Sequence, residues 1–577
     1  MKLSMARALA IFVLFFAPFC SSALEIRQTL WGFNGQVTPD AFNPLSVLVD
    51  NPSPAPFSGA LMLREGGVAN STTSGYVEPI YIAPGTTRWV QFYPFLNDER
   101  NWELTWGTHR GESLEVPKPT WAAPAQVFFT DPEEVLGAAS HFKSFPDNLF
   151  PPAVTATDAL ASVVLDHVPR WEPVRRVAFL DWIRRGGTLH LLRGRDGTFP
   201  IFTEDLAALN FMESSSGFGA GRVVHHDLSR TEATEEKLHQ KLPQLLTPSS
   251  SGMNLDLETT FFQRLAALTK PDINWRLIYL LAFAYLGLIG PAHYFWGRRK
   301  QSRRVIGCLF LLVFLFGGAF RVVGHRGFDE ISAVHSLAWA RSLGEGRWDT
   351  FEWGTVFVTR GDRYTISHVF NHNLYAAAPY DGNSTAGQII DGKEGGFKVD
   401  IPRYSSRAYI HRAVVEAADF TPSVDVWKED SDLAQLDVQL KGKPPENIRV
   451  AWVFRRGRFY DMTAKDSNHL SLGKLRRSPA EFFNSQNLYG SMIGYNNLGP
   501  NFPGVASDLL PFIIARATGA PDVFIRGLDL PPLPDDTVQL FILADSPPNL
   551  HPTGKDFSKA AGCVVYEMKI FKPTHPS

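Results

Sequence analysis

The middle of the chain reads LIYLLAFAYLGLIGPAHYFW over Leu277–Trp296 and, after a short polar segment, VIGCLFLLVFLFGGAFRVV over Val305–Val323. A bilayer core about 30 Å thick is crossed by roughly 20 apolar residues in a helix, at about 1.5 Å of rise per residue. Both stretches have that length. The sequence therefore predicts two transmembrane helices, over 275–296 and 305–323, arranged as a hairpin.

The segment that joins the two stretches is strongly basic. Residues 297–304 read GRRKQSRR and contain no acidic residue. Arginine and lysine in short loops are retained on the cytoplasmic side of a membrane. We therefore expect this loop to be cytoplasmic and both outer flanks of the hairpin to be exported.

The N-terminal residues 1–23 have the parts of a secretory signal peptide. A basic start that contains Lys2 and Arg7 precedes an apolar run, and the small residues Ser21–Ala23 offer a cleavage site. We expect the mature chain to begin at Leu24 and to be exported, which agrees with the orientation expected from the basic loop.

Composition narrows the class of protein. The chain has 577 residues, enough for several domains, and a formal net charge of −2. A net charge this close to zero gives no overall positive potential that would attract nucleic acid, so we expect no nucleic-acid partner. Its three cysteines are Cys20, Cys308 and Cys563. The first lies in the signal peptide and the second in an apolar stretch, so no disulfide is expected within either exported region, and a zinc site built from paired cysteines is excluded.

Residues 24–116 alternate strand-like runs with turn signals. Ser46–Val49 and Trp89–Phe92 are two of the runs, while Asn51–Pro52 and Pro84–Gly85 mark turns. This order is typical of an immunoglobulin-like β-sandwich.

The hydrophobic period changes in residues 124–241. Ala161–Leu165 and Thr188–Leu192 are short apolar runs of the kind found in buried strands. Between them, a helix over 173–185 is predicted, because proline stands at its first position and Gly186 follows its last. Alternating strands and helices indicate a parallel sheet with crossover helices.

The last part of the chain is predicted to be mainly β. Runs such as Thr355–Val358 and Gln539–Ile542 are separated by turn-forming residues, and helical insertions are expected around 479–493 and 505–518.

The fold class predicted is a multidomain α+β membrane protein. Before the membrane region it has a signal peptide over 1–23, an immunoglobulin-like β-sandwich over 24–116, an α/β domain over 124–241, and a connector and pre-membrane helix over 242–274. Transmembrane helices over 275–296 and 305–323 then flank a basic loop over 297–304, and an exported mainly-β domain follows over 335–577.

Three motifs resemble those of a family of bacterial inner-membrane proteins, most of them uncharacterised. They are FLDWIRRGGTL at Phe179–Leu189, GAGRVV at Gly219–Val224 and YLGLIGPAHYF at Tyr285–Phe295. The resemblance implies an exported β-sandwich, a class I glutamine-amidotransferase-like domain, a two-helix hairpin and a C-terminal β domain. It also implies a place in the bacterial inner membrane, with both large soluble regions in the periplasm.

The amidotransferase-like domain lacks the nucleophile of that enzyme class. Class I glutamine amidotransferases attack with a cysteine that a histidine activates. No cysteine lies between Cys20 and Cys308, and Ser162 lies inside a predicted strand rather than at a nucleophile elbow. Amidotransferase activity is therefore excluded. We expect a non-enzymatic protein and assign no catalytic residue.

Two polar motifs precede or follow the predicted strand at residues 223–225. Gly217–Gly221 resembles a phosphate loop, but it leads into a strand rather than a helix, so a glycine-rich hairpin is favoured. His225 and Asp227 lie on one face of the strand and His226 on the other, because neighbouring strand residues alternate. Two ligands alone define no metal site.

Two further groups remain candidates. His368 and His372 share a predicted strand face near Asp362, but no third ligand has suitable spacing, so no metal or cofactor is predicted. Asp166 and His167 follow a buried strand at its C-terminal end, where α/β folds place ligands. They are the preferred position for a pocket, although a capping or loop role is also open.

These observations favour a scaffold or accessory subunit of an envelope complex, with a link to transport as one option. Its expected partners are the lipid bilayer and membrane or periplasmic proteins. One alternative is a membrane-anchored module that binds or senses a ligand such as a glycan or peptide. A further alternative is a hydrolase with a nucleophile other than cysteine.

Overall fold

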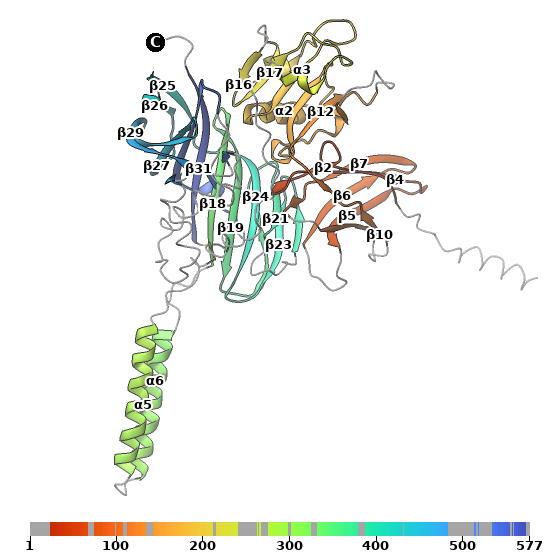
Figure 1. Cartoon of the computed structure of the whole chain (residues 1–577). Coiled ribbons are helices and arrows are strands. Elements are labelled where there is room, and N and C mark those ends of the chain that lie inside the picture. Colours follow the sequence, from red (N-terminus) through yellow and green to blue (C-terminus); the bar gives the residue numbers. More distant parts are fainter. Residues whose placement is uncertain are drawn as a thin grey trace, which may run out of the picture. The chain divides into compact units, whose positions relative to one another are not determined.

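The structure is a computed structural model of the chain (Figure 1). It describes residues 24–66, 74–97, 100–107, 112–133, 142–211, 215–239, 262, 265–266, 275–297, 302–324, 332–378, 387–430, 432–479, 481–482, 513–514, 517–518, 533–553, 557 and 559–572. The predicted signal peptide lies outside these residues, as do most of the connector and most of both helical insertions.

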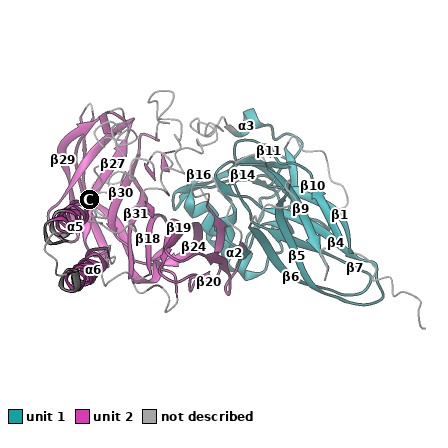
Figure 2. Ribbon diagram, turned by 90° about the horizontal axis from the view of Figure 1, so that it is seen from below, with its two compact units in different colours: residues 1–252, 388–391 teal, residues 253–387, 392–577 magenta. Residues whose placement is uncertain are grey.

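The chain divides into two compact units, coloured separately in Figure 2. Unit 1 comprises residues 1–252 together with 388–391, and unit 2 comprises residues 253–387 and 392–577.

Unit 1 begins with antiparallel strands in two sheets. One sheet has the order β1-β4-β7, and the part of the second that lies in unit 1 has the order β10-β9-β5-β6-β22, in which β22 runs parallel to β6. Two short pairs, β2-β11 and β3-β8, accompany them. The bounds are β1 (Glu25–Trp31), β2 (Gln36–Val37), β3 (Ala41–Phe42), β4 (Leu45–Asn51), β5 (Phe57–Gly66), β6 (Gly75–Ile82), β7 (Thr86–Phe92), β8 (Phe95–Leu96), β9 (Asn101–Trp106), β10 (Glu112–Val116), β11 (Thr120–Trp121) and β22 (Gly387–Ile390).

A six-stranded sheet follows in unit 1, with the order β13-β12-β14-β15-β17-β16. All its neighbours are parallel except β16 and β17. Its elements are β12 (Ala125–Thr130), β13 (Lys143–Pro146), η1 (Asp147–Leu149), η2 (Val154–Ala156), β14 (Leu160–Leu165), α2 (Pro173–Arg185), β15 (Thr188–Leu191), η3 (Glu204–Leu209), β16 (Ser215–Phe218), β17 (Gly221–His225) and α3 (Glu235–His239).

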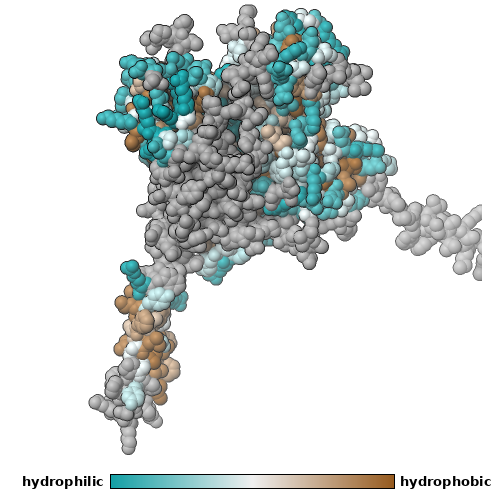
Figure 3. Space-filling view, viewed as in Figure 1, coloured by the Kyte–Doolittle hydropathy of each residue, from teal (hydrophilic) through white to brown (hydrophobic). Residues whose placement is uncertain are grey.

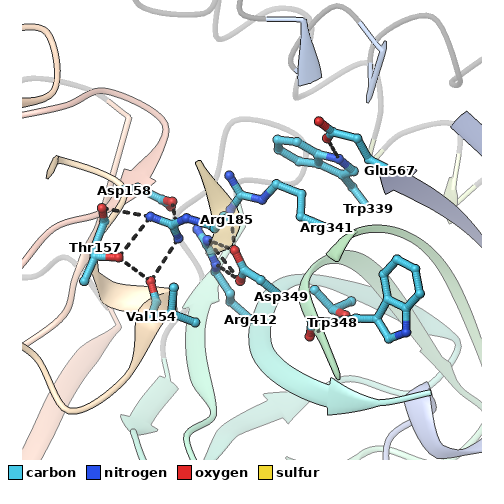
Figure 4. Close-up of polar contacts among 11 residues, drawn as sticks. Val154, Thr157, Asp158, Arg185, Trp339, Arg341, Trp348, Asp349, Arg412 and Glu567 are labelled. Carbon is cyan, nitrogen blue, oxygen red and sulfur yellow. Dashed lines mark hydrogen bonds and ion pairs between the residues drawn. The ribbon is translucent and has the colours of Figure 1, made fainter. Parts of the chain in front are cut away.

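Helix α2 confirms the helix predicted from its flanking proline and glycine. It ends at Gly186, whose φ of 134° suits a residue without a side chain. The next residue, Gly187, is also constrained, since a Cβ there would lie 2.4 Å from the Trp182 ring. Arg185 fixes the end of the helix by donating to the carbonyl oxygens of Val154 and Thr157, each at 2.9 Å (Figure 4).

The predicted fold class is wrong in its balance of elements. The part of the chain that the structure describes is mainly β, with 51% of residues in strands and 18% in helices. Among the described residues of the six-stranded sheet, α2 is the one long α-helix, and the other described connections contain the short 3-10 helices η1, η2 and η3. Such short 3-10 turns bury no continuous helical face, so they add little helix to a chain that is mainly strand.

Helices α5 (Trp275–Gly297) and α6 (Ser302–Gly324) lie side by side (Figure 1). Among the described residues, only Ile306–Val323 in α6 is long and apolar enough for a span, with a mean hydropathy of 2.3. The apolar part of α5, Arg276–Gly290, is shorter. At about 1.5 Å per residue it covers about 22 Å, less than a bilayer core of about 30 Å. The prediction of a hairpin made from two full spans is therefore not retained.

Unit 2 is built on an eleven-stranded sheet with the order β21-β24-β19-β18-β31-β30-β27-β28-β29-β26-β25. Its strands are β18 (Ala333–Gly344), β19 (Arg347–Val358), β21 (Leu374–Ala377), β24 (Ser405–Glu416), β25 (Phe420–Glu429), β26 (Leu433–Gly442), β27 (Ile448–Arg455), β28 (Arg458–Ala464), β29 (His469–Arg477), β30 (Thr537–Asp545) and β31 (Lys559–Phe571). Strands β20 (Asp362–Ile366) and β23 (Gly396–Ile401) form an antiparallel pair, and η4 (Pro548–Leu550) follows β30.

The two faces of β19 carry different groups, because side chains alternate along a strand. On one face Trp348 belongs to the main apolar core of unit 2. On the other, Asp349 accepts hydrogen bonds from Arg412 at 2.8 Å and Arg341 at 2.6 Å (Figure 4). Asp349 and Arg412 are each 1% exposed, so the ion pair is fully desolvated. Such a pair requires both partners, since either charge alone would be costly in this position.

Candidate functional site

A polar row crosses three neighbouring strands of the unit 2 sheet. Glu352 on β19 is directly opposite His411 on β24, and His411 is directly opposite Tyr375 on β21. Directly opposite residues point to the same face of a sheet, so these three side chains share one face. The strand register thus brings together residues that are far apart in sequence.

A fourth side chain joins the row from the segment that follows β20. His368 donates its backbone N–H to the Tyr375 hydroxyl at 2.9 Å, and its Nδ1 lies 3.0 Å from the same oxygen. Asn373 holds this segment by donating from Nδ2 to the carbonyl oxygen of Phe370 at 2.7 Å. The position of His368 is therefore fixed by both its backbone and its ring.

The Glu352 carboxylate lies between two imidazoles. Its Oε2 is 3.1 Å from Nδ1 of His411 and 3.4 Å from Nε2 of His368, and its Oε1 accepts a hydrogen bond from the Tyr409 hydroxyl at 3.2 Å. The two imidazoles stack with ring centroids 3.7 Å apart and an angle of 6° between planes. Exposure is 0% for Glu352, 3% for His368 and 1% for His411, so the group is shielded from bulk water.

Gly354 makes room for this arrangement. It is directly opposite Tyr409, and a Cβ at Gly354 would lie 2.1 Å from Cζ of the tyrosine ring. With no side chain at that position, the ring crosses the strand and its hydroxyl reaches Glu352. Glycine at 354 is therefore part of the site.

Protonation of Glu352 and His411 is coupled. Burial raises the pKa of Glu352, but the two imidazoles beside it, His368 and His411, outweigh burial and hold that pKa below its ordinary range. Burial and, to a smaller extent, the neighbouring His368 lower the pKa of His411 to about 4, although Glu352 acts to raise it. However, the two ring nitrogens of His411 face acceptors, Glu352 Oε2 at 3.1 Å and Asn373 Oδ1 at 3.0 Å. Since Asn373 is fixed by its own donor bonds, we assign one shared proton to the Glu352–His411 pair.

Among the described residues, Glu352, His368 and His411 are the one group in which three histidine, cysteine or carboxylate ligand atoms all lie within 4.8 Å of one another. Two imidazole nitrogens and one carboxylate oxygen form a donor set found in zinc and other transition-metal sites. We call these three residues the Glu-His-His group. A metal ion is the ligand that its chemistry suits.

Sequence reasoning identified one of the three members. His368 was paired with His372 and Asp362, but neither of these belongs to the group. Glu352 and His411 are 59 residues apart and come together through the pairing of β19 with β24. The signal that could have found them was a charged residue inside an otherwise apolar strand, as in the run Phe351–Trp353, where a carboxylate needs a partner.

The predicted pocket at Asp166 and His167 is filled by a balanced ion network. Asp166 accepts two hydrogen bonds from the Arg230 guanidinium, at 2.9 and 3.0 Å. His167 lies 3.2 Å from Asp166 and 3.2 Å from Asp147. Although burial lowers the pKa of His167, hydrogen bonds to Asp147 and Asp166 raise it to about 9. Two carboxylates, those of Asp147 and Asp166, therefore face two cations, those of His167 and Arg230. All four groups form bonds within this network.

The other candidates near residue 225 are spread apart. His226 turns to His190, with Nε2 and Nδ1 3.0 Å apart, and Asp227 forms an ion pair with Arg193. His225 instead contacts the edge of Phe199. The glycine motif forms the turn of the β16–β17 hairpin, which confirms the hairpin prediction.

Comparison with known proteins gives little support for an identity. No family model matches the chain, and no curated protein does. Among solved structures, it is similar to a cycloisomaltooligosaccharide glucanotransferase from Paenibacillus sp., complexed with cycloisomaltoheptaose. The match has 8% identity and a TM-score of 0.16, and covers 79% of this chain and 98% of the other.

The matched structure is an enzyme by its title, and the expectation of a non-enzymatic protein is not retained. A TM-score of 0.16 carries no argument for a shared fold or for any activity. The resemblance to bacterial inner-membrane proteins remains a prediction.

Proposed function

We propose that this chain is a membrane-attached accessory or scaffold protein of a bacterial cell envelope. Its folded part after α6 is exported and binds membrane or periplasmic proteins. The observation that carries the proposal is the surface of α6. Its 18-residue window Ile306–Val323 has a mean hydropathy of 2.3, and none of it is buried inside the structure.

An apolar surface of this size is unfavourable in water and requires a nonpolar environment around it. Phe314, Leu315 and Leu311 are 77%, 63% and 62% exposed, and Figure 3 shows hydrophobic residues in brown along the helix pair. Transfer of each such side chain out of water is worth about 1.5–3 kcal/mol. A bilayer covers the whole window at once, and its thickness matches the length of the window.

The sequence between the helices supports an orientation. Residues 298–304 contain Arg and Lys but no acid, and such segments are retained on the cytoplasmic side. The N-terminal end of α6 is then cytoplasmic, and the folded part after α6 is exported. Helix α5 packs against α6 through Tyr285 and Phe316, whose rings are 5.2 Å apart.

Alkaline phosphatase fusions test this orientation. A fusion after Glu330 should be active, because the enzyme folds only outside the cytoplasm, and a fusion at Gln301 should be inactive. If the fusion at Gln301 is active and the fusion after Glu330 is inactive, α6 has the opposite orientation, which contradicts the proposal.

Attachment through α6 is tested by a charge in its apolar surface. Leu315→Arg should release a large fraction of the chain from the membrane, because an arginine near the middle of a span costs about 2.5–3.5 kcal/mol. The matched control is Ile201→Arg, since Ile201 in unit 1 is also highly exposed, at 77%. Equal membrane retention of both variants would argue that α6 is not the anchor.

The scaffold role is tested by purification from membranes in mild detergent. Specific proteins should co-elute with the wild-type chain in fixed proportion. Recovery of a monomer without any companion, from cells that express it at its natural level, would contradict the role.

The second candidate function is a membrane-attached module that binds or senses a small ligand. One observation favours it: the Glu-His-His group lies fully buried in the sheet of unit 2. Apolar residues would fill this position at lower cost than a carboxylate, so stability alone does not account for the group.

A further inference from the structure

We propose that Glu352, His368 and His411 bind a divalent transition-metal ion, with Zn²⁺ the best match. This site lies inside unit 2 and is independent of the proposed envelope role. The separations of its ligand atoms are close to those around a bound ion. Glu352 Oε2 is 3.1 Å from His411 Nδ1 and 3.4 Å from His368 Nε2. Donor atoms around a tetrahedral zinc, with bonds of about 2.0–2.2 Å, lie about 3.3–3.5 Å apart.

The second nitrogen of each imidazole is held by an oxygen. His411 directs Nε2 to Asn373 Oδ1 at 3.0 Å, and His368 directs Nδ1 to the Tyr375 hydroxyl at 3.0 Å. Metal-binding histidines are oriented in this way, since a hydrogen bond from the other ring nitrogen sets the tautomer and the plane of the ring. Here both bonds leave the nitrogens that face Glu352 as the ligand atoms.

Two buried nitrogens in this neighbourhood make no hydrogen bond within the described residues. They are Nε2 of His368 and Nδ1 of His551. His551 is close enough to Glu352 and His368 to feel their charges. Its segment is held beside His368 because the backbone N–H of Thr553 donates to the carbonyl oxygen of Ser367 at 2.7 Å. A metal ion would satisfy the first nitrogen directly and would place His551 as a candidate fourth ligand.

The ring stack shows what must move when an ion binds. The lone pair of an imidazole nitrogen lies in the ring plane, so two parallel rings 3.7 Å apart do not both point at one ion. His368 is the ring that tilts, because its Nε2 gives up no hydrogen bond. The His411 ring keeps its bond to Asn373 and exchanges a proton for the ion.

Burial limits what the site can accept. Its three ligand residues are 0–3% exposed, and aromatic rings including Phe370 and Tyr375 lie against the two histidines. A sugar or a peptide has no room there, whereas a single ion fits between side chains. The shielded position is typical of a structural or regulatory metal rather than one that activates a substrate.

The test uses the full chain purified in detergent, stripped with a chelator and titrated with Zn²⁺ in a calorimeter. We expect one tight site per chain. Co²⁺ in the same site should show the strong visible absorption of a tetrahedral complex. His368→Gln should weaken Zn²⁺ binding at least tenfold and abolish the cobalt spectrum. His372→Gln is the matched control, since it is a nearby histidine outside the group, and it should bind like the wild type.

Two further variants keep the test decisive if His368→Gln unfolds. Tyr375→Phe removes only the hydroxyl that orients His368, and it should weaken Zn²⁺ binding by about 10–100-fold with an unchanged circular dichroism spectrum. His551→Gln should weaken binding if that residue is the fourth ligand and leave it unchanged if the site has three protein ligands and a water. Absence of stoichiometric binding in the wild type, or equal affinity in Tyr375→Phe and wild type, would overturn the proposal.

Discussion

Unit 1 and unit 2 each contain a buried histidine–carboxylate group, and the two groups are built differently. In unit 1, His167 lies between Asp147 and Asp166, and Arg230 neutralises the second carboxylate through two hydrogen bonds. In unit 2, Glu352 lies between two histidines and no arginine or lysine is bonded to it among the described residues. The first group is balanced by its own charges, whereas the second has an excess of ligand nitrogens.

This difference separates a structural network from a binding site. In the balanced network of unit 1, each charged group is bonded to a group of opposite charge. These bonds connect strand ends to loops, so the network stabilises the fold. The Glu-His-His group has a nitrogen without a hydrogen bond at His368 and outer oxygens that orient both rings. Groups with shifted pKa values occur in both units, so a shifted pKa alone does not identify a functional site.

Removal of the central carboxylate should give the largest contrast between the two groups. Glu352→Leu should lower the free energy of unfolding by about 2–6 kcal/mol, because it leaves the His411 ring nitrogen and the Tyr409 hydroxyl buried without their acceptor, at about 1–3 kcal/mol each. Asp166→Leu should cost only about 1–3 kcal/mol, since Arg230 and His167 are partly exposed and gain water. Urea unfolding of both variants measures this. Equal losses would mean that the two groups do the same structural work.

The unit 1 network should make stability depend on pH in a defined window. His167 has a pKa of about 9 in the folded chain, above its usual 6.5. Its contribution is therefore complete below about pH 6.5 and is lost as the pH rises through about 9, and it amounts to at most about 3 kcal/mol.

The measurement is urea unfolding of unit 1 between pH 6 and pH 10, with His167→Gln as the reference. The charges that face His167 are Asp147 and Asp166, and Arg230 lies beyond them. The stability lost by the wild type across this range should be absent from the variant. A parallel loss in both proteins would place the titrating group elsewhere.

A methyl group at Gly354 should affect unit 2 to a smaller extent. In Gly354→Ala the new Cβ meets the Tyr409 ring, so the ring must shift and its hydrogen bond to Glu352 is lost. We expect a loss of about 1–3 kcal/mol from overpacking. Thermal unfolding measures it. Gly217→Ala is the control, because a Cβ at Gly217 meets no atom within 4 Å, and it should be nearly neutral.

The smallest effect is expected at Asp362, which the sequence placed beside His368. Its side chain is exposed at the start of β20 and is outside the Glu-His-His group. Asp362→Asn should therefore change the free energy of unfolding by no more than about 0.5 kcal/mol and leave Zn²⁺ binding unchanged. A clear loss of metal affinity would show that the boundary drawn around the group is wrong.

Local elements of the fold were accessible from the sequence. Pro173 and Gly186 bound α2 as predicted, and the apolar run at 161–165 is the strand β14. The apolar window of α6 was also evident. The overall class was not, because the lengths of β18, β19 and β24 and the 3-10 character of the short connections depend on packing across the sheet.

The sequence by itself determined which segments are strands, where α2 starts and stops, and that α6 carries an apolar surface suited to a membrane, although it also predicted a second full span that is not retained. Each of these follows from interactions between residues a few positions apart. Only the tertiary structure decided that Glu352 meets His411 and that His368 turns toward them rather than toward His372. Strand alternation indicates which face a residue occupies but not which distant strand lies beside it, and the register of β19 with β24 supplied that information.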